Sequence, residues 1–431
     1  MALHRIEPEL IERANAMAAA THGADLDALA GQLQRRGVDV EAALRRLTAF
    51  AIAIPSWGVG TGGTRFARFP VPGEPGNVFD KLDDCAVVHQ LGRATPTVSL
   101  HFPWDVVENV AALKEHGAAL GLGFDAVNSN TFQDQPGQPH SYKFGSLSHT
   151  NAAVRDQAIA HNIDCICLGT GLGSKALTVW IADGSNFAGQ TNLSTAFERY
   201  IDSMHRIVAA LPDDWQVFIE YKNFEPAFYA TVVQDWGAAL LAAQALGDKA
   251  ACLVDLGHHA PSTNIEQIVS RLIAARKLGG FHLNDSRYGD DDLDAGSIDP
   301  FRLFLIFNEL IDAEQRGALH QPPAYMLDQS HNLTDPIESL LLSAEAASRA
   351  YTQALLVDRA ALAGYQQEND ALMAASTLRR AFHCDVSPLL AEARRRMGGA
   401  IDTVAVYRAS GYRAAVSQVR KAPTPSGGGI V

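Results

Sequence analysis

The chain has 431 residues, of which 47% are hydrophobic, and its 48 acidic and 35 basic side chains give a formal net charge of −13. This acidic balance argues against a nucleic-acid partner, because surfaces that bind nucleic acids carry an excess of lysine and arginine. No stretch approaches the roughly 18 consecutive apolar residues of a membrane span, and the amino-terminal residues lack the apolar core of a signal peptide. We therefore expect a soluble, cytoplasmic protein with no membrane partner.

The chain begins with a helical pattern that later changes to strands. Residues 1–48 predict helices, because apolar side chains recur three and four positions apart. From residue 49 onward, short apolar stretches alternate with amphipathic stretches of helical period. Uninterrupted apolar runs are typical of parallel strands that are buried on both faces. The eight stretches that we interpret as strands span residues 50–58, 97–105, 122–130, 176–185, 215–224, 250–259, 279–286 and 323–330.

The number of strands indicates the fold. Eight parallel strands with helical crossovers close a (β/α)₈ TIM barrel, which we predict over residues 49–365. An open, doubly wound sheet is the alternative that the pattern leaves. Residues 366–431 continue as a helical extension that ends in a segment rich in proline, serine and glycine. We expect this last segment to be flexible or to contact a partner subunit.

Charged side chains interrupt four of the apolar runs near their ends. In a TIM barrel, catalytic groups come from the carboxyl ends of the strands. A buried carboxylate is costly unless it is paired or bound to a metal. One such residue alone would be read as a hydrogen-bonded core acid, but four on consecutive strands predict a site for a divalent cation. Three oxygen ligands and one imidazole suit Mn²⁺, Co²⁺ or Mg²⁺. The four residues are Glu220, Asp255, His282 and Asp328.

A second cation site is suggested by the acidic loop after the seventh strand. Asp290 and Asp292 are two positions apart in this loop, so both carboxylates can point the same way. His258, three residues after Asp255, would lie on the neighbouring loop. Together these groups could hold a second cation near the first, an arrangement that can bridge two oxygens of one substrate. A solvated acidic turn is the alternative interpretation.

Other polar and aromatic residues follow the same strands. Lys222 lies two positions after Glu220, and His101, Trp57 and Trp180 follow three further strands. Aromatic walls with a few polar groups suit a sugar ring. The alternative for the tryptophans is core filling, which we expect for Trp104. The glycine-rich residues 58–70 lack the ending of a phosphate-binding loop, so they predict a loop over the barrel mouth or an arm that reaches a neighbouring subunit.

Several long stretches resemble one known family. The stretches PSWGVGTGGTRFARFP, FDKLDDCAV, HSYKFGSLSHTNA, KALTVWIADGSNF, CLVDLGHHAP, NDSRYGDDDLDAG and DQSHNLTDPIES are similar to L-rhamnose isomerases, in particular to the bacterial branch that also acts on D-allose. The similarity extends over about residues 30–420. It implies a metal-dependent aldose–ketose isomerase on a TIM barrel of the xylose isomerase type, usually a homotetramer, with two divalent cations per subunit, Mn²⁺ first among them.

The resemblance assigns roles to individual positions. Glu220, Asp255, His282 and Asp328 match the ligands of the family's structural metal, and His258, Asp290 and Asp292 match those of its catalytic metal. Lys222, His101, Trp57 and Trp180 match positions that contact the substrate, and Phe66 matches an aromatic residue that reaches a neighbouring subunit's site. Tyr221 departs from the family, because close relatives tend to carry histidine there. Side chains alternate along a strand, so we expect Tyr221 to face the surrounding helices.

The resulting hypothesis is the isomerisation of L-rhamnose to L-rhamnulose, and of D-allose to D-psicose, by a metal-assisted hydride shift between C2 and C1. Asp328, Lys222 and His101 would be the catalytic residues. Few carboxylates remain outside the ligand sets to act as a carbon base, which favours a hydride shift over an enediol. A ketose 3-epimerase on the same type of barrel is the main alternative. A metal-dependent phosphodiesterase would need a basic groove, and a sugar-binding protein would not need two metal sites.

Overall fold

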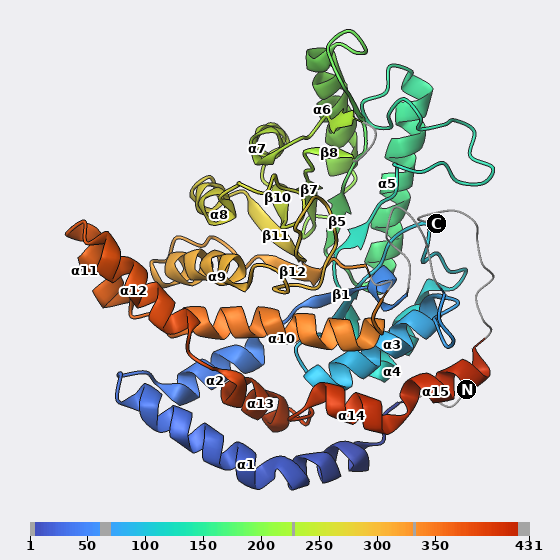
Figure 1. Ribbon diagram of the computed structural model, residues 1–431. Helices are drawn as coiled ribbons and strands as arrows, with labels where there is room; N and C mark the ends of the chain where they lie inside the picture. The colour runs from blue at the N-terminus through green and yellow to red at the C-terminus, as the bar shows by residue number, and fades with distance from the viewer. Residues whose placement is uncertain (1–4, 61–69, 226–228, 331–332, 421–431) are drawn as a thin grey trace.

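The computed structural model describes residues 5–60, 70–225, 229–330 and 333–420. Its main sheet has nine strands in the order β3-β2-β1-β12-β11-β10-β7-β5-β4, and all neighbouring pairs are parallel (Figure 1). The strands are β1 (Ala53–Pro55), β2 (Thr97–Ser99), β3 (Gly123–Phe124), β4 (Val127–Asn128), β5 (Ala176–Val179), β7 (Gln216–Glu220), β10 (Ala250–Asp255), β11 (Leu278–Leu283) and β12 (Ala324–Leu327).

The sheet closes on itself because its two outermost strands belong to one stretch of chain. β3 and β4 are separated by only two residues, and both fall in the predicted strand 122–130. The Asn128 backbone bonds to the residues beyond β2, its N–H donating to the Leu100 carbonyl at 2.9 Å and its carbonyl accepting from Phe102 N–H at 2.9 Å. The predicted TIM barrel is therefore confirmed, and the open sheet was the wrong alternative. Each predicted strand range contains a barrel strand or most of its length.

A small cluster of residues from the barrel strands and the turn between β3 and β4 packs around one aromatic ring. Ala126, Ala176, Ala251 and Leu253 cluster around Phe218. Gly279 makes room for this ring, because a Cβ there would lie 2.7 Å from Phe218 Cδ1. Strands β10 and β11 are buried along their whole length. This burial on both faces explains why their sequences are continuous apolar runs.

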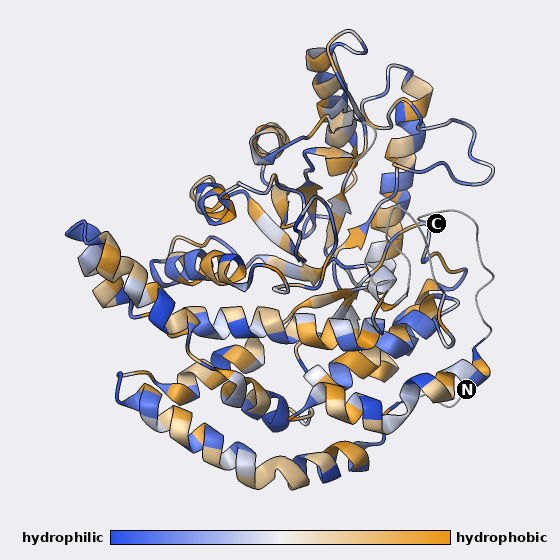
Figure 2. Cartoon of the chain, viewed as in Figure 1, coloured by the Kyte–Doolittle hydropathy of each residue, from blue (hydrophilic) through white to orange (hydrophobic). Residues whose placement is uncertain are grey.

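Among the described residues, eight helices cover the outside of the barrel. Each begins at an asparagine or aspartate whose side chain accepts a backbone N–H of the first turn. Such caps satisfy donors that a helix start leaves unpaired, and each contributes about 1 kcal/mol. Figure 2 shows hydrophobic and hydrophilic residues alternating along these helices. They are α3 (Val78–Gly92), α4 (Val110–Leu120), α5 (Ala152–Leu172), α6 (Leu193–Ala209), α7 (Trp236–Ala245), α8 (Ile265–Ala274), α9 (Pro300–Gln315) and α10 (Pro336–Leu355).

Further elements lie at the carboxyl ends of the strands. A short 3₁₀ helix, η1 (Ser56–Val59), follows β1. A small antiparallel sheet pairs β9 (Tyr229–Thr231) with both β6 (Gly184–Ser185) and β8 (Phe224–Glu225). Two predicted runs, 176–185 and 215–224, thus continue past their barrel strands into this second sheet.

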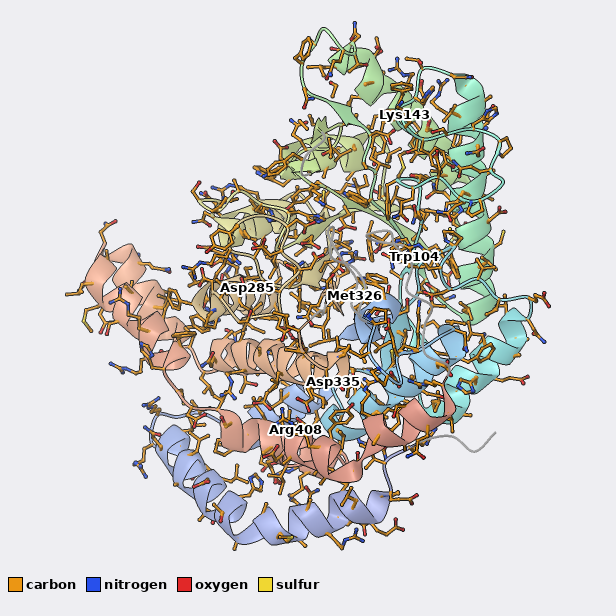
Figure 3. The ribbon with its side chains drawn as sticks, turned by 45° about the vertical axis from the view of Figure 1, so that its right-hand side comes forward. Trp104, Lys143, Asp285, Met326, Asp335 and Arg408 are labelled. Carbon is orange, nitrogen blue, oxygen red and sulfur yellow. The ribbon has the colours of Figure 1, made fainter. Side chains whose placement is uncertain are left out.

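Helices from both ends of the chain pack beside one another below the barrel (Figure 1). Arg396 on α13 forms an ion pair with Glu41 on α2, with an N–O distance of 2.6 Å. Figure 3 marks Asp335 at the start of α10 and Arg408 on α14; Arg408 pairs with Glu338 of α10 at 2.6 Å. The helices of these two extensions are α1 (Pro8–Gln34), α2 (Val40–Ala49), α11 (Arg359–Gln367), α12 (Ala371–Phe382), α13 (Ser387–Arg396), α14 (Thr403–Ser410) and α15 (Tyr412–Val419).

The domain limits at residues 48 and 365 stay predictions, and the second falls inside α11. The expected tail at residues 421–431 and most of the expected arm at 58–70 lie outside the described residues. Among the residues that are described, no helix is both long enough and apolar enough to cross a membrane.

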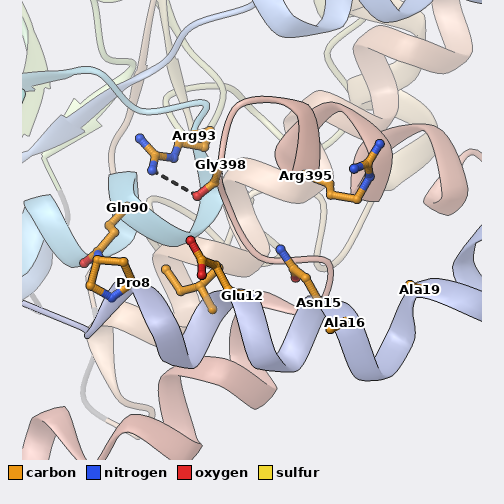
Figure 4. A pocket seen from close by; sticks show the side chains of 10 residues that line it. Pro8, Glu12, Asn15, Ala16, Ala19, Gln90, Arg93, Arg395 and Gly398 are labelled. Atoms are coloured by element: carbon orange, nitrogen blue, oxygen red, sulfur yellow. Dashed lines mark hydrogen bonds between the residues drawn. The ribbon is translucent and has the colours of Figure 1, made fainter.

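A cavity of about 430 Å³ lies between α1, the end of α3 and the turn after α13 (Figure 4). Glu12, Asn15 and Arg93 line it, and Arg93 donates a hydrogen bond to the Gly398 carbonyl at 3.0 Å. None of the described residues that we predict for the metal and substrate sites lines this cavity.

The last helix is docked onto Gly73, a residue in the left-handed region with φ of +80°. The Gly73 carbonyl accepts hydrogen bonds from Arg413 at 3.0 Å and Arg420 at 2.9 Å. A Cβ at this position would lie 2.9 Å from the Ser417 backbone nitrogen. The close approach and the positive φ both require glycine here.

We predict that Gly73→Ala lowers the free energy of unfolding by about 1–3 kcal/mol, because the new methyl group meets backbone atoms of α15. Gly76→Ala is the matched control, since its Cβ would meet only the flexible end of Asp80, at 3.7 Å. Urea unfolding followed by circular dichroism measures both variants. Equal midpoints for the two would contradict the prediction.

Candidate functional site

Four of the predicted metal ligands gather at the carboxyl ends of adjacent strands. Glu220 ends β7, Asp255 ends β10, His282 lies near the end of β11, and Asp328 directly follows β12. Asp255 and His282 are directly opposite each other across the β10–β11 pair. Ligand atoms of all four residues lie within 4.8 Å of one another. The parallel strands therefore bring the four side chains together.

The His282 ring lies at the centre of this group. Its Nδ1 is 3.2 Å from Glu220 Oε1, 3.2 Å from Asp328 Oδ2 and 3.6 Å from Asp255 Oδ2. Burial alone would lower the pKa of His282, but the carboxylates, Glu220 first, raise its pKa well above the ordinary value. Three carboxylates at this spacing need a positive charge among them, and the protonated imidazole is one source of it.

The donor set of this group fits a divalent cation. Asp255 is fully buried, and its Oδ2 makes no hydrogen bond with any of the described residues. The other oxygen, Oδ1, accepts from Gly257 N–H at 2.8 Å and from Asn284 Nδ2 at 3.0 Å. These bonds fix the carboxylate and leave Oδ2 directed at its neighbours. Oxygen ligands with one imidazole suit Mg²⁺, Mn²⁺ or Co²⁺.

A second group shares Asp255. Ligand atoms of Asp255, His258 and Asp290 also lie within 4.8 Å of one another. His258 Nε2 is 3.4 Å from Asp290 Oδ1 and 4.0 Å from Asp255 Oδ2. Burial would lower the pKa of His258, but Asp255 and Asp290 raise it to about 9. Its Nδ1 donates to the Tyr221 carbonyl at 3.0 Å, which leaves Nε2 as the atom available to a cation.

Asp292 does not belong to either group. It has a positive φ of 50°, and its Oδ2 accepts a hydrogen bond from Ser330 Oγ at 3.2 Å. Its role as a ligand of the second cation stays a prediction. The sequence assigns Asp255 and His258 to different cations, whereas in the structure Asp255 contributes to both groups.

The predicted substrate residues line one wall beside these ligands. The His101 ring stacks on Trp104 with a centroid distance of 3.9 Å and meets the Trp57 ring edge-on at 5.4 Å. The centroids of the Phe132 and Trp180 rings are 4.5 Å apart. The Trp57 indole N–H donates to Asp328 Oδ1 at 3.0 Å, so the wall directly adjoins the first ligand group.

Lys222 and His101 provide the polar groups of the wall. Lys222 is 3% exposed, and its Nζ is 2.6 Å from Asp290 Oδ2 and 5.0 Å from the centre of the Trp180 ring. Burial lowers the pKa of His101 to about 3, so its imidazole is neutral at physiological pH. Phe66, the remaining predicted substrate residue, lies outside the described residues.

The amino-acid sequence is closely similar to the sequences of two known proteins. It is 67% identical over 407 residues to a probable sugar isomerase of Rhizobium meliloti (strain 1021), with 94% of this chain and 95% of that protein covered. It is 62% identical over 426 residues to a probable sugar isomerase of Mesorhizobium japonicum, with 99% of both covered. The chain belongs to the family of these probable sugar isomerases. No protein-family model matches it.

Solved structures with lower identity also align with this member of the family. A xylose isomerase domain protein from Alicyclobacillus acidocaldarius has a TM-score of 0.48 and 16% identity, covering 71% of this chain and 99% of that one. An L-ribulose 3-epimerase has a TM-score of 0.47 and 14% identity, covering 77% and 97%.

Sequence reasoning missed part of the aromatic wall. Phe132 was not singled out, although it follows the third strand closely. Trp104 was expected to fill the core, but it is only partly buried and stacks on His101. Tyr221 is buried, as strand alternation suggested, and its hydroxyl lies 2.8 Å from His259 Nε2. The missed residues lie on loops, where periodicity gives no direction for a side chain.

We predict that the metal-free protein binds Mn²⁺ with release of protons. The pKa values of His258 and His282 are raised without a cation, so both rings carry protons near neutral pH, and a cation must displace them. Affinity should therefore fall as the pH is lowered from about 8 to about 6. Isothermal titration calorimetry in buffers with different protonation enthalpies measures both effects.

Asp255→Asn should abolish this binding, whereas Asp285→Asn should retain it. Asp285 is an equally buried acid just after β11, but it pairs with Arg302 at 2.6 Å and belongs to neither ligand group. At a hundredfold excess of Mn²⁺ over Kd, the wild type should gain about 2.7 kcal/mol of stability. Loss of binding in both variants, or in neither, would contradict the assignment.

Proposed function

We propose that this protein is a metal-dependent aldose–ketose isomerase that converts L-rhamnose to L-rhamnulose, and D-allose to D-psicose. The observation that supports it most is the arrangement of two ligand groups that share Asp255 and adjoin an aromatic wall. The names of the two relatives support the sugar isomerase class. The specific sugars rest on the sequence resemblance to L-rhamnose isomerases. A homotetramer in which Phe66 reaches a neighbouring site, and a location in the cytoplasm, belong to the same proposal.

The residues that would hold the cations follow from the two groups. Glu220, Asp255, His282 and Asp328 would hold the first, and His258 and Asp290, with Asp292, the second. Bound divalent cations would supply Lewis-acid polarisation of adjacent sugar oxygens. The donor set on this chain, rich in carboxylates and without a thiolate, favours Mn²⁺, Co²⁺ or Mg²⁺.

The protein's own residues would bind and orient the open-chain sugar. Trp57, His101 and Trp180 present aromatic surface to the apolar face of the sugar and exclude water from the reacting carbons. Lys222, positioned by Asp290, donates a hydrogen bond to a sugar oxygen and stabilises negative charge that develops there. Neutral His101 can donate or accept a hydrogen bond at a sugar hydroxyl. Asp328, oriented by the Trp57 indole, lies where it can assist ring opening.

The distribution of carboxylates favours direct transfer of hydride from C2 to C1 of the sugar. An enediol route needs a base that is free to remove the C2 proton, for which a carboxylate is one common choice. Glu220, Asp255, Asp290 and Asp328 all belong to the ligand groups. A 3-epimerase would need two carboxylates on opposite sides of C3, and Glu220 is the one glutamate that ends a described barrel strand.

The first test is proton NMR of chelator-treated and Mn²⁺-reloaded protein with L-rhamnose, then D-allose, in deuterated water. We expect ketose formation that depends on the metal, with little deuterium at C1. Deuterium at C1 would overturn the hydride shift but keep the isomerase. Conversion of a ketose to its C3 epimer, without aldose formation, would favour the 3-epimerase. No turnover with metal bound would overturn the proposed function.

Two neighbouring residues directly after β7 allow a matched test of the polar wall. Lys222→Met should lower kcat/KM at least ~100-fold, because it removes a buried charge beside the substrate. Tyr221→Phe should change kcat/KM by less than about threefold, because it removes only the contact with His259 on the opposite face. Steady-state kinetics with metal content checked in each variant measures both. Similar losses in the two variants would contradict the assignment of Lys222.

A further inference from the structure

A buried carboxylate outside the ligand groups connects the parts of the aromatic wall. Asp105 lies beyond β2, and its side chain is 0% exposed. One oxygen, Oδ2, accepts hydrogen bonds from the Ser56 hydroxyl and, at 2.8 Å, from the His101 backbone N–H. The other oxygen, Oδ1, accepts from Lys81 Nζ at 2.6 Å. Three donors from three segments of the chain therefore meet at one side chain.

Of these donors, one belongs to the residue before Trp57 in the chain, and another is the backbone N–H of His101 itself. Ser56 precedes Trp57 in η1. The His101 N–H belongs to the residue whose ring stacks on Trp104 and meets Trp57 edge-on. The Asp105 N–H also donates to the His101 carbonyl at 3.0 Å, which closes the turn between the two residues. The positions of η1 and of this turn relative to each other thus depend on Asp105.

The third donor, Lys81, balances the negative charge of the Asp105 carboxylate. Lys81 lies on α3, and its side chain is 17% exposed, so the ion pair is shielded from water on the carboxylate side. A buried carboxylate without such a partner would be strongly unfavourable. Ser56, Lys81 and His101 all donate to the Asp105 oxygens, so the site requires two accepting oxygens. An amide would direct an N–H₂ group at one of these donors.

We propose that Asp105 is a positioning residue for substrate binding, which fixes Trp57 and His101 at the separation that the sugar requires. Asp105 does not touch the substrate; it acts through the two aromatic residues that do, so the inference rests on the proposed function. A wall held in place before binding avoids the cost of ordering these side chains when the sugar arrives.

The test compares Asp105→Asn with Asp84→Asn. Asp84 is also fully buried, but it pairs with Arg420 at 2.8 Å and accepts from the Tyr412 hydroxyl at 2.6 Å, on the side of α3 that faces the carboxy-terminal helices. Both substitutions disrupt a buried ion pair, whereas only Asp105→Asn affects the wall. Asp105→Asn should raise KM for L-rhamnose roughly tenfold and change kcat by less than about twofold. Asp84→Asn should leave both constants unchanged per folded molecule.

A second variant and a second measurement do not depend on turnover. Ser56→Ala removes one donor and should raise KM in the same direction by a smaller factor. Incorporation of 5-fluorotryptophan gives ¹⁹F signals for the five tryptophans of the chain. Signals of Trp57 and Trp104, assigned with Trp57→Phe and Trp104→Phe, should shift in Asp105→Asn and stay in place in Asp84→Asn. The Trp215 and Trp236 signals should not move.

Each outcome decides one question. Unchanged KM and unchanged ¹⁹F signals in folded Asp105→Asn would overturn the positioning role, as would equal changes in Asp84→Asn. If Asp105→Asn does not fold, the test rests on Ser56→Ala. In that variant, a KM and a Trp57 ¹⁹F signal equal to those of the wild type would overturn the inference. If the wild type isomerises no sugar, the proposed function fails, and the ¹⁹F signals alone then decide whether Asp105 positions the wall.

Discussion

The electrostatic repulsion among carboxylates at the strand ends is the constraint on which the rest of this site depends. Glu220, Asp255 and Asp328 approach one another because the barrel brings the carboxyl ends of parallel strands to one small area. Like charges at this distance oppose folding unless a positive charge lies among them. The His282 imidazolium supplies one such charge, and a divalent cation would supply a stronger one. The same arrangement therefore explains both the raised histidine pKa and why the donor set fits a divalent cation.

Contacts of single residues hold the elements of the scaffold around these charges in place. Asparagine and aspartate caps fix the starts of all eight barrel helices. Gly279 gives Phe218 its place inside the barrel. Outside the barrel, Arg413 and Arg420 attach the last helix to Gly73. The helix caps and the packing of Phe218 support the barrel whose strand ends carry the ligand groups.

Asp255 connects the two ligand groups. One of its oxygens is held by Gly257 and Asn284, and the other faces both His282 and His258. Cations at the two groups would therefore interact through this carboxylate, so that occupancy of one affects the other. The wall joins the same system through the bond from Trp57 to Asp328. In the proposed function, metal binding and sugar binding would therefore be coupled by direct contacts.

The pattern of residues along the chain was sufficient to predict the barrel and to single out the four residues of the first ligand group. Eight apolar runs with helical crossovers are compatible with few folds, of which the barrel is one. In a barrel, an acid or histidine near the end of such a run lies close to the ends of the neighbouring strands. The folded chain was needed to show that Asp255 belongs to both groups and that Trp104 and Phe132 join the wall. It was also needed to show that Asp105 accepts hydrogen bonds from both Ser56 and Lys81. These contacts join loops and helices far apart in the chain. Loop conformation has no periodicity from which the direction of a side chain can be read, so such contacts become visible only when the chain is folded.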